Sequence, residues 1–220
     1  MSTRDDVIAR VRAALEGSPA APEATGRNYR LAGDWPVGDP RLVDLLVDRL
    51  EDYRATVHRS KESGIPDTVR TILIGRADPV TSTGSSEPRR VVLPPGLPRD
   101  WCPGSVEHIV DDDLPIDLLE SFDGVITGAA LAIAETGTIV LDASADQGRR
   151  VITLLPDRHV CVIRCDQIVA TVPEAISRLD PTRPMTWISG PSATSDIELT
   201  RVEGVHGPHH LHVIIVQATG

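Results

Sequence analysis

Residues 124–141, GVITGAALAIAETGTIVL, are the most informative stretch of this chain. The runs at 125–127 and 138–141 are β-branched and bounded by glycines, a pattern typical of short buried strands. Between them stands one carboxylate, Glu135, among small residues, and Gly137 permits backbone geometries that larger residues resist. Because α/β proteins bind ligands at strand ends of this kind, the stretch predicts a buried sheet with a ligand site beside Glu135.

The segments on either side of this stretch alternate between strands and helices. We expect helices at 118–122, 149–155 and 173–179, strands at 160–164, 185–189 and 211–216, and an alanine-rich segment of unassigned structure at 129–134. Short β-branched runs that alternate with helices are typical of α/β proteins. The sequence therefore predicts a layered, mostly parallel sheet flanked by helices.

The N-terminal part predicts an arm followed by a core helix. An amphipathic helix is expected at 3–16, and a linker rich in Pro, Ala and Gly follows to residue 38. The apolar stripe of that helix must pack on the body or on a neighbouring subunit. A second helix begins at Asp39-Pro40, an N-cap followed by the residue favoured at the first helical position.

Beyond this core helix the pattern is less regular. We expect a strand near 55–58, a helix or strand at 69–74, a strand at 91–93 and a loop-rich stretch at 94–115. The expected organisation is thus an N-terminal helix and linker at 1–38 and one domain at 39–220.

Charge and composition exclude several classes of protein. A net charge of -10 would repel a polyanion, and 3% aromatic residues leave few platforms for base stacking, so nucleic acid is excluded as a partner. No apolar run approaches the roughly 18 residues of a transmembrane helix, and the N-terminus lacks the apolar stretch of a signal peptide. We expect a cytoplasmic protein with no membrane partner.

The cysteines argue against a resident metal centre. Cys102, Cys161 and Cys165 are odd in number and form no CxxC pair, which speaks against a disulfide framework, a zinc knuckle and an iron–sulfur cluster in this chain. The sequence also lacks GxGxxG after a strand, GxxxxGK[ST], HExxH and GxSxG. We therefore predict no cofactor for the chain itself.

A serine-rich segment follows the strand expected at 185–189. Its glycine lets the chain turn, and its hydroxyls and backbone amides can cradle a phosphate or a carboxylate. A capped turn into a helix would explain the same residues, since Ser and Thr cap helices widely. The ligand-binding residues predicted here are Ser189, Gly190, Pro191, Ser192, Thr194 and Asp196.

A histidine-rich segment lies near the C-terminus. Four of the seven histidines, His206, His209, His210 and His212, fall within seven residues, which invites a metal-binding interpretation. The spacing fits no zinc motif, however, and His210 and His212 alternate as ordinary strand residues would. His206 is the better candidate for proton transfer or for binding a carboxylate, although its ring could equally bond the turn backbone. Gly207, which follows it, is predicted to bind the ligand.

Glu135 is the other candidate catalytic residue. Its carboxylate could act as a general base, or as a nucleophile that forms an acyl intermediate, or it could simply cap backbone amides in a tight turn. Thr136, Gly137 and Thr138 follow it directly and are predicted to bind the same ligand.

Together, AIAETGTIVL, SGPSATSDIEL and GVHGPHHLHVIIV resemble the lactate-utilisation protein C family, the stand-alone LUD domain. The resemblance implies the fold of the ribose-phosphate isomerase, glucosamine-phosphate deaminase and coenzyme A transferase group. It also implies a role in oxidising L-lactate to pyruvate beside iron–sulfur subunits. In coenzyme A transferases of this group a glutamate beside a glycine accepts the acyl group, and Glu135-Thr136-Gly137 looks similar.

Three hypotheses follow. The first is a subunit of a lactate-oxidising complex with iron–sulfur partners. The second is an independent enzyme acting on a small carboxylate, a coenzyme A ester or a sugar phosphate, with Glu135 as base or nucleophile. The third is a metal-binding module built from the four histidines. Each is compatible with a homo-oligomer.

Overall fold

The computed structural model describes residues 3–15, 30–74, 89–195, 201–203 and 207–217. They belong to two compact units, one within residues 1–30 and one within residues 31–220. The first contains helix α1 (Thr3–Leu15), which confirms the expected N-terminal helix and buries none of its residues. Val7, Val11 and Leu15 leave an exposed apolar stripe along α1.

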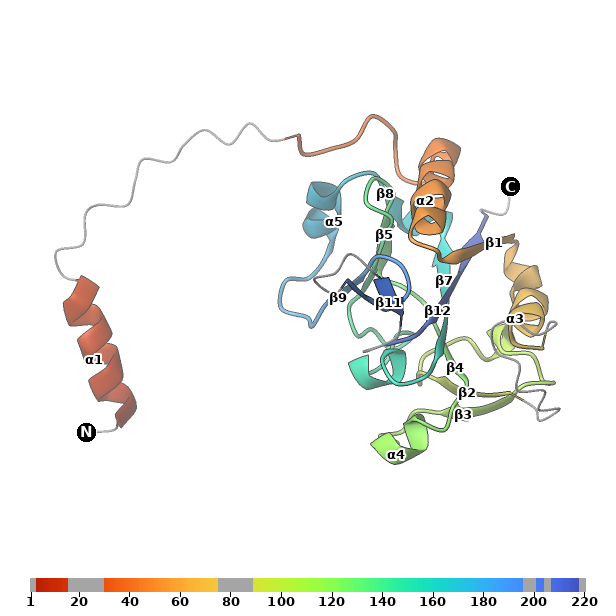
Figure 1. Ribbon diagram of the computed structural model, residues 1–220. Helices are drawn as coiled ribbons and strands as arrows, with labels where there is room; N and C mark the ends of the chain where they lie inside the picture. Colours follow the sequence, from red (N-terminus) through yellow and green to blue (C-terminus); the bar gives the residue numbers. More distant parts are fainter. Residues whose placement is uncertain (1–2, 16–29, 75–88, 196–200, 204–206, 218–220) are drawn as a thin grey trace. The chain divides into compact units, whose positions relative to one another are not determined.

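The second unit is built on a six-stranded sheet in which every neighbouring pair is parallel (Figure 1). In spatial order its strands are β1 (Thr56–Ser60), β12 (His210–Val216), β7 (Arg158–Arg164), β4 (Gly124–Thr127), β2 (Arg90–Leu93) and β3 (Glu107–Val110). The inner strands read as continuous apolar runs because both faces of the sheet are covered. The predicted α/β class with a mostly parallel sheet is confirmed.

Helices cover the two faces of this sheet. Helix α3 (Ile65–Ile74) packs on one face through Ile65, Val69 and Leu73. Helix α2 (Pro40–Asp52) packs on the other face through Leu42, Leu46 and Leu50. The predicted start of α2 is confirmed, since the Asp39 side chain accepts a hydrogen bond from the Arg41 amide and Pro40 is the first helical residue.

A second, four-stranded sheet forms another layer beside α2. Its order is β8 (Ile168–Val169), β5 (Leu131–Ile133), β6 (Thr138–Leu141) and β9 (Thr186–Ile188), with β5 and β6 paired as an antiparallel hairpin. Successive residues point to opposite faces, so Ala132 and Ile139 pack toward the central sheet. Val140 packs on the other side, toward helix α5 (Val172–Arg178).

Short elements complete the unit. They are the 3-10 turns η1 (Glu62–Gly64), η2 (Arg99–Trp101), η3 (Arg150–Thr153) and η4 (Cys165–Gln167), the single-turn helix α4 (Ile116–Leu119), and the antiparallel pair β10 (Ala193–Ser195) and β11 (Arg201–Glu203). Among the described residues, no helix has the length and apolar character that crossing a membrane requires.

Several expected elements differ in the structure. The alanine-rich segment contains strand β5, and the loop-rich stretch at 94–115 contains strand β3. The helix expected at 149–155 is the 3-10 turn η3, and the one expected at 118–122 is the short α4. The helix-capping alternative for the serine-rich segment is wrong, because the chain after Ser192 enters strand β10.

Candidate functional site

Glu135 lies on the turn that joins β5 to β6. The turn is closed by a hydrogen bond from the Gly137 amide to the Ala134 carbonyl, at 3.4 Å. Gly137 has φ of +58°, and a Cβ there would lie 2.7 Å from Cβ of Arg49 on α2. Gly137 is thus required by the turn and by its packing on α2, while the Glu135 side chain is exposed.

Hydroxyl groups link this turn to the serine-rich segment. The Thr136 and Thr138 hydroxyls lie 2.8 Å apart, and the Thr138 hydroxyl lies 2.9 Å from that of Ser189. Two segments that the sequence predicted as ligand-binding therefore meet side by side. Their meeting follows from the pairing of β6 with β9.

The serine-rich segment also meets the segment that precedes β12. The Ser192 amide donates a hydrogen bond of 2.9 Å to the Pro208 carbonyl. Gly207 has φ of +138°, and a Cβ there would lie 3.3 Å from the Ser192 hydroxyl oxygen. A side chain at position 207 would therefore crowd Ser192.

A cavity of about 270 Å³ opens where these two segments meet. Five residues predicted from the sequence line it: Ser189, Gly190, Pro191, Ser192 and Gly207. The sequence did not predict its other principal lining residues: Arg150, Thr153, His159, Trp187, Ile188 and Leu211.

Arg150 supplies the positive charge of this cavity. Its Nη1 donates hydrogen bonds to the hydroxyl of Thr153 at 3.0 Å and to the Thr153 carbonyl at 3.3 Å. Burial lowers the pKa of the guanidinium from its usual value, and it stays positive at neutral pH. Among the described residues, no carboxylate forms an ion pair with Arg150.

His159 supplies an uncharged imidazole. Its side chain is 1% exposed, and Nε2 lies 2.8 Å from the Thr127 hydroxyl at the end of β4. Burial, aided by the charge of Arg150, lowers the pKa of His159 to about 4, so the ring is neutral at neutral pH. A fixed cation, a neutral imidazole and two serine hydroxyls together suit a small anion.

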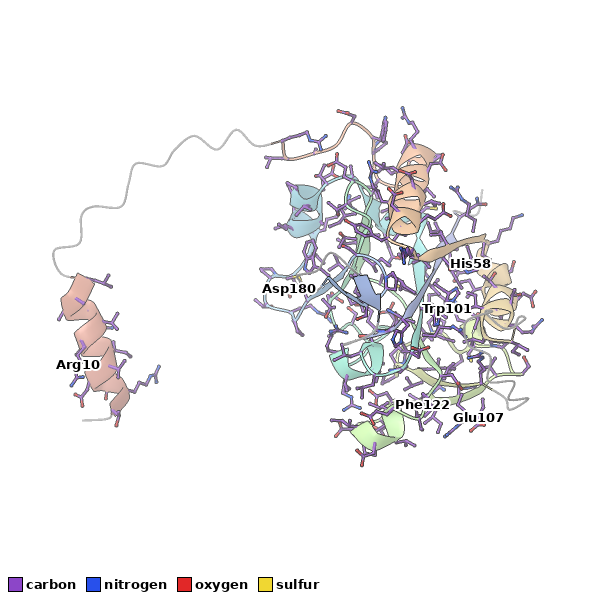
Figure 2. All side chains as sticks on the ribbon, viewed as in Figure 1. Arg10, His58, Trp101, Glu107, Phe122 and Asp180 are labelled. Atoms are coloured by element: carbon purple, nitrogen blue, oxygen red, sulfur yellow. The ribbon has the colours of Figure 1, made fainter. Side chains whose placement is uncertain are left out.

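The histidine-rich segment is divided between different environments. His209 pairs through Nδ1 with Asp157. His212 lies on β12 with Nδ1 3.2 Å from Nε2 of His58, which belongs to β1 (Figure 2). Because Leu211 lines the cavity, the alternation along β12 directs His210 and His212 to the opposite face. Among the described residues, no three His, Cys, Asp or Glu side chains could hold one metal ion.

The remaining predicted site residues are only partly described. Thr194 lies in strand β10. Asp196 and His206 lie outside the described residues. A common role for Glu135 and His206 therefore stays a prediction.

A larger cavity, of about 450 Å³, is lined by residues that directly follow β4 and β7 in the chain. Three carboxylates line it, from Asp142, Asp146 and Asp166, with Arg178 as a positive group. Burial raises the pKa of Asp146, whose carboxylate lies against Gly128 and leaves no room for a side chain there. This acidic lining suits the predicted anion less well than the cavity at Arg150.

Comparison with known proteins identifies the family. The LUD domain family matches residues 116–216. A protein of Deinococcus radiodurans named lactate utilization protein C is 43% identical over 187 residues, 82% of each chain. One of the same name from Shouchella clausii is 30% identical over 98% of each chain. The crystal structure of a DUF162 family protein from Deinococcus radiodurans superimposes with a TM-score of 0.66 at 36% identity, covering 82% of this chain and 99% of that one. The chain belongs to the lactate utilization protein C family of LUD-domain proteins.

Proposed function

We propose that this protein takes part in lactate utilization, supporting the oxidation of L-lactate to pyruvate beside iron–sulfur subunits. The observation that carries the proposal is its 43% identity, over 82% of both chains, to a protein named lactate utilization protein C. The spacing of the three cysteines suits no iron–sulfur cluster in this chain. Electron transfer in such a system would therefore be carried by partner subunits.

Growth of a deletion strain tests this role. Loss of the gene should abolish or strongly slow growth on L-lactate while growth on pyruvate stays normal, and the tagged protein should co-purify with cysteine-rich subunits. Growth on L-lactate at the parental rate, with no co-purifying subunit, would contradict the proposal.

A second candidate function is that of an independent enzyme acting on a small carboxylate, a coenzyme A ester or a sugar phosphate. Its support is the cavity at Arg150, together with the hydroxyls of Thr136, Thr138 and Ser189 that run from the Glu135 turn to the cavity wall. In this function Glu135 is the base or nucleophile, and the predicted residues of the serine-rich segment hold the anion.

A thermal-shift panel of these three ligand classes tests the second candidate, since a ligand that binds only the folded protein raises its melting temperature. A ligand that stabilises the wild type should be turned over by it and bound but not turned over by Glu135→Gln. If no compound raises the melting temperature, this candidate fails.

A further inference from the structure

The guanidinium of Arg150, which lines the cavity at β9, is held by Thr153 through one nitrogen. Among the described residues, Thr153 accepts both hydrogen bonds that the Arg150 side chain donates, and both come from the same nitrogen, Nη1. Within the described part of the chain, Nε and Nη2 have no hydrogen-bond acceptor. Two parallel N–H groups on one edge of a guanidinium match the two oxygens of a carboxylate.

The imidazole of His159 offers a second polar contact in the same cavity. Nε2 is engaged by the Thr127 hydroxyl, whereas Nδ1 has no hydrogen-bond partner among the described residues. The ring is close enough to Arg150 for the positive charge to act on it. A neutral imidazole can accept a hydrogen bond from a hydroxyl or donate one to a carbonyl, according to its tautomer.

The rest of the wall is partly apolar. Ile188 and Leu211 contribute aliphatic surface, and Trp187, which is 41% exposed, contributes an indole ring. At ~30 Å³ for each water-sized group, a volume of about 270 Å³ holds a ligand of a few carbon atoms with some ordered water.

We propose that this cavity binds a 2-hydroxy or 2-oxo monocarboxylate, with the carboxylate on Arg150 and the adjacent oxygen on the ring of His159. The short aliphatic part of the ligand then lies against Ile188 and Leu211. One guanidinium beside a neutral ring balances one negative charge, which favours a carboxylate over a phosphate dianion. This inference rests on the proposed role in lactate utilization and names the ligand class of the site.

Calorimetric titration of the full-length protein with L-lactate, pyruvate, propionate and inorganic phosphate tests the ligand class. Propionate keeps the carboxylate but lacks the oxygen on carbon 2. L-lactate or pyruvate should bind saturably, and propionate and phosphate at least ~10-fold more weakly, because a site built to hydrogen-bond an oxygen rejects an analogue without it. Equal affinity for propionate, tighter binding of phosphate, or no saturable binding of lactate and pyruvate would overturn the proposal.

Variants assign the contacts. Arg150→Met should weaken lactate or pyruvate binding at least ~10-fold, whereas Arg178→Met, which changes an arginine of the other cavity, should bind as the wild type does. Thr127→Val releases the ring of His159 without replacing it and should weaken lactate and pyruvate more than propionate. Thr127→Val is used in place of His159→Gln where substitution of the buried ring unfolds the protein. Unchanged binding by Arg150→Met, or equal losses for all ligands in Thr127→Val, would contradict the assignment.

The growth experiment separates this inference from the proposed function. If the deletion strain fails on L-lactate but the protein binds no 2-oxygenated monocarboxylate, this ligand assignment is wrong and the role in lactate utilization stands. If the protein binds such a ligand but the deletion strain grows normally on L-lactate, the role is wrong and the site stands.

Discussion

The hydroxyl of Thr138 lies 2.9 Å from the hydroxyl of Ser189, and this contact joins the Glu135 turn to the wall of the cavity at Arg150. The two residues are 51 positions apart in sequence and meet because β6 pairs with β9. Thr138 is 5% exposed and also contacts Thr136. Its hydroxyl is therefore the central member of a short hydroxyl chain.

Removing that hydroxyl should destabilise the protein and loosen the cavity wall. Thr138→Val is expected to lower the free energy of unfolding by about 1–2 kcal/mol, because the buried hydrogen bonds are lost without a change of shape. Thr71→Val, which removes an exposed hydroxyl on α3, should cost less than about 0.5 kcal/mol. Urea unfolding of both variants measures the difference, and equal losses would contradict the central place of Thr138.

Gly137 should be intolerant of any side chain. Gly137→Ala is expected to lower the free energy of unfolding by about 1–3 kcal/mol, because φ is +58° and the new Cβ would press on Cβ of Arg49. Gly104→Ala is the matched control, since a Cβ at Gly104 meets no atom within 4 Å. Equal losses of unfolding free energy for Gly137→Ala and Gly104→Ala in chemical denaturation would contradict the described packing of the turn on α2.

Much of the fold could be predicted from the sequence, because the central strands are β-branched runs buried on both faces. The sequence did not predict strand β5, because residues 129–134 are mostly alanine, which has little preference for strands. The sequence did not predict strand β3 either, because its four residues, EHIV, lie in a loop-rich stretch and are not fully buried. Both strands form because they pair with neighbouring strands of their sheets. Such pairing depends on the tertiary structure and not on the local sequence.

Only part of the candidate site could be predicted from the sequence. Ser189, Gly190 and Gly207 could be predicted because they lie in segments whose glycines and hydroxyl side chains form a recognisable local pattern. Arg150 and His159 stand in ordinary surroundings, about 30 to 40 positions before Ser189 in sequence. Only the packing of η3, β7 and β9 around one cavity gives them a shared environment.

The buried imidazole of His159 predicts loss of stability in acid. Its pKa falls from 6.5 in the unfolded chain to about 4 in the folded protein, so the unfolded state binds the proton more readily as the pH drops between these values. The free energy of unfolding should therefore decrease from about pH 6.5 toward pH 4, with His159 contributing up to about 3 kcal/mol. His212, whose pKa burial lowers to about 3, adds a further decrease.

Comparison of His159→Gln with the wild type isolates this contribution. The variant should show a shallower decrease in unfolding free energy over the same pH range. His108→Gln, at an exposed position of β3, should retain the wild-type profile. A His159→Gln profile parallel to the wild type would show that the ring is not buried as described.

Arg149 tests the difference between a buried and an exposed ion pair on one side chain. It contacts Asp111, whose side chain is 2% exposed, at 2.6 Å, and Asp113, whose side chain is 90% exposed, also at 2.6 Å. Asp113→Asn should change the unfolding free energy by less than about 1 kcal/mol. Arg149→Met should cost about 2 kcal/mol, below the ~3–5 kcal/mol of a fully buried pair because Arg149 is 40% exposed. Guanidinium chloride unfolding would contradict this assignment if Asp113→Asn were the more costly change.

Complementation of the deletion strain on L-lactate as sole carbon source measures whether the cavity at Arg150 is needed for growth on lactate. The wild-type gene and Arg178→Met should restore growth, and Arg150→Met, produced at the same level and equally folded, should not. Restoration of growth by Arg150→Met at the wild-type rate would contradict the claim that the cavity at Arg150 serves lactate utilization.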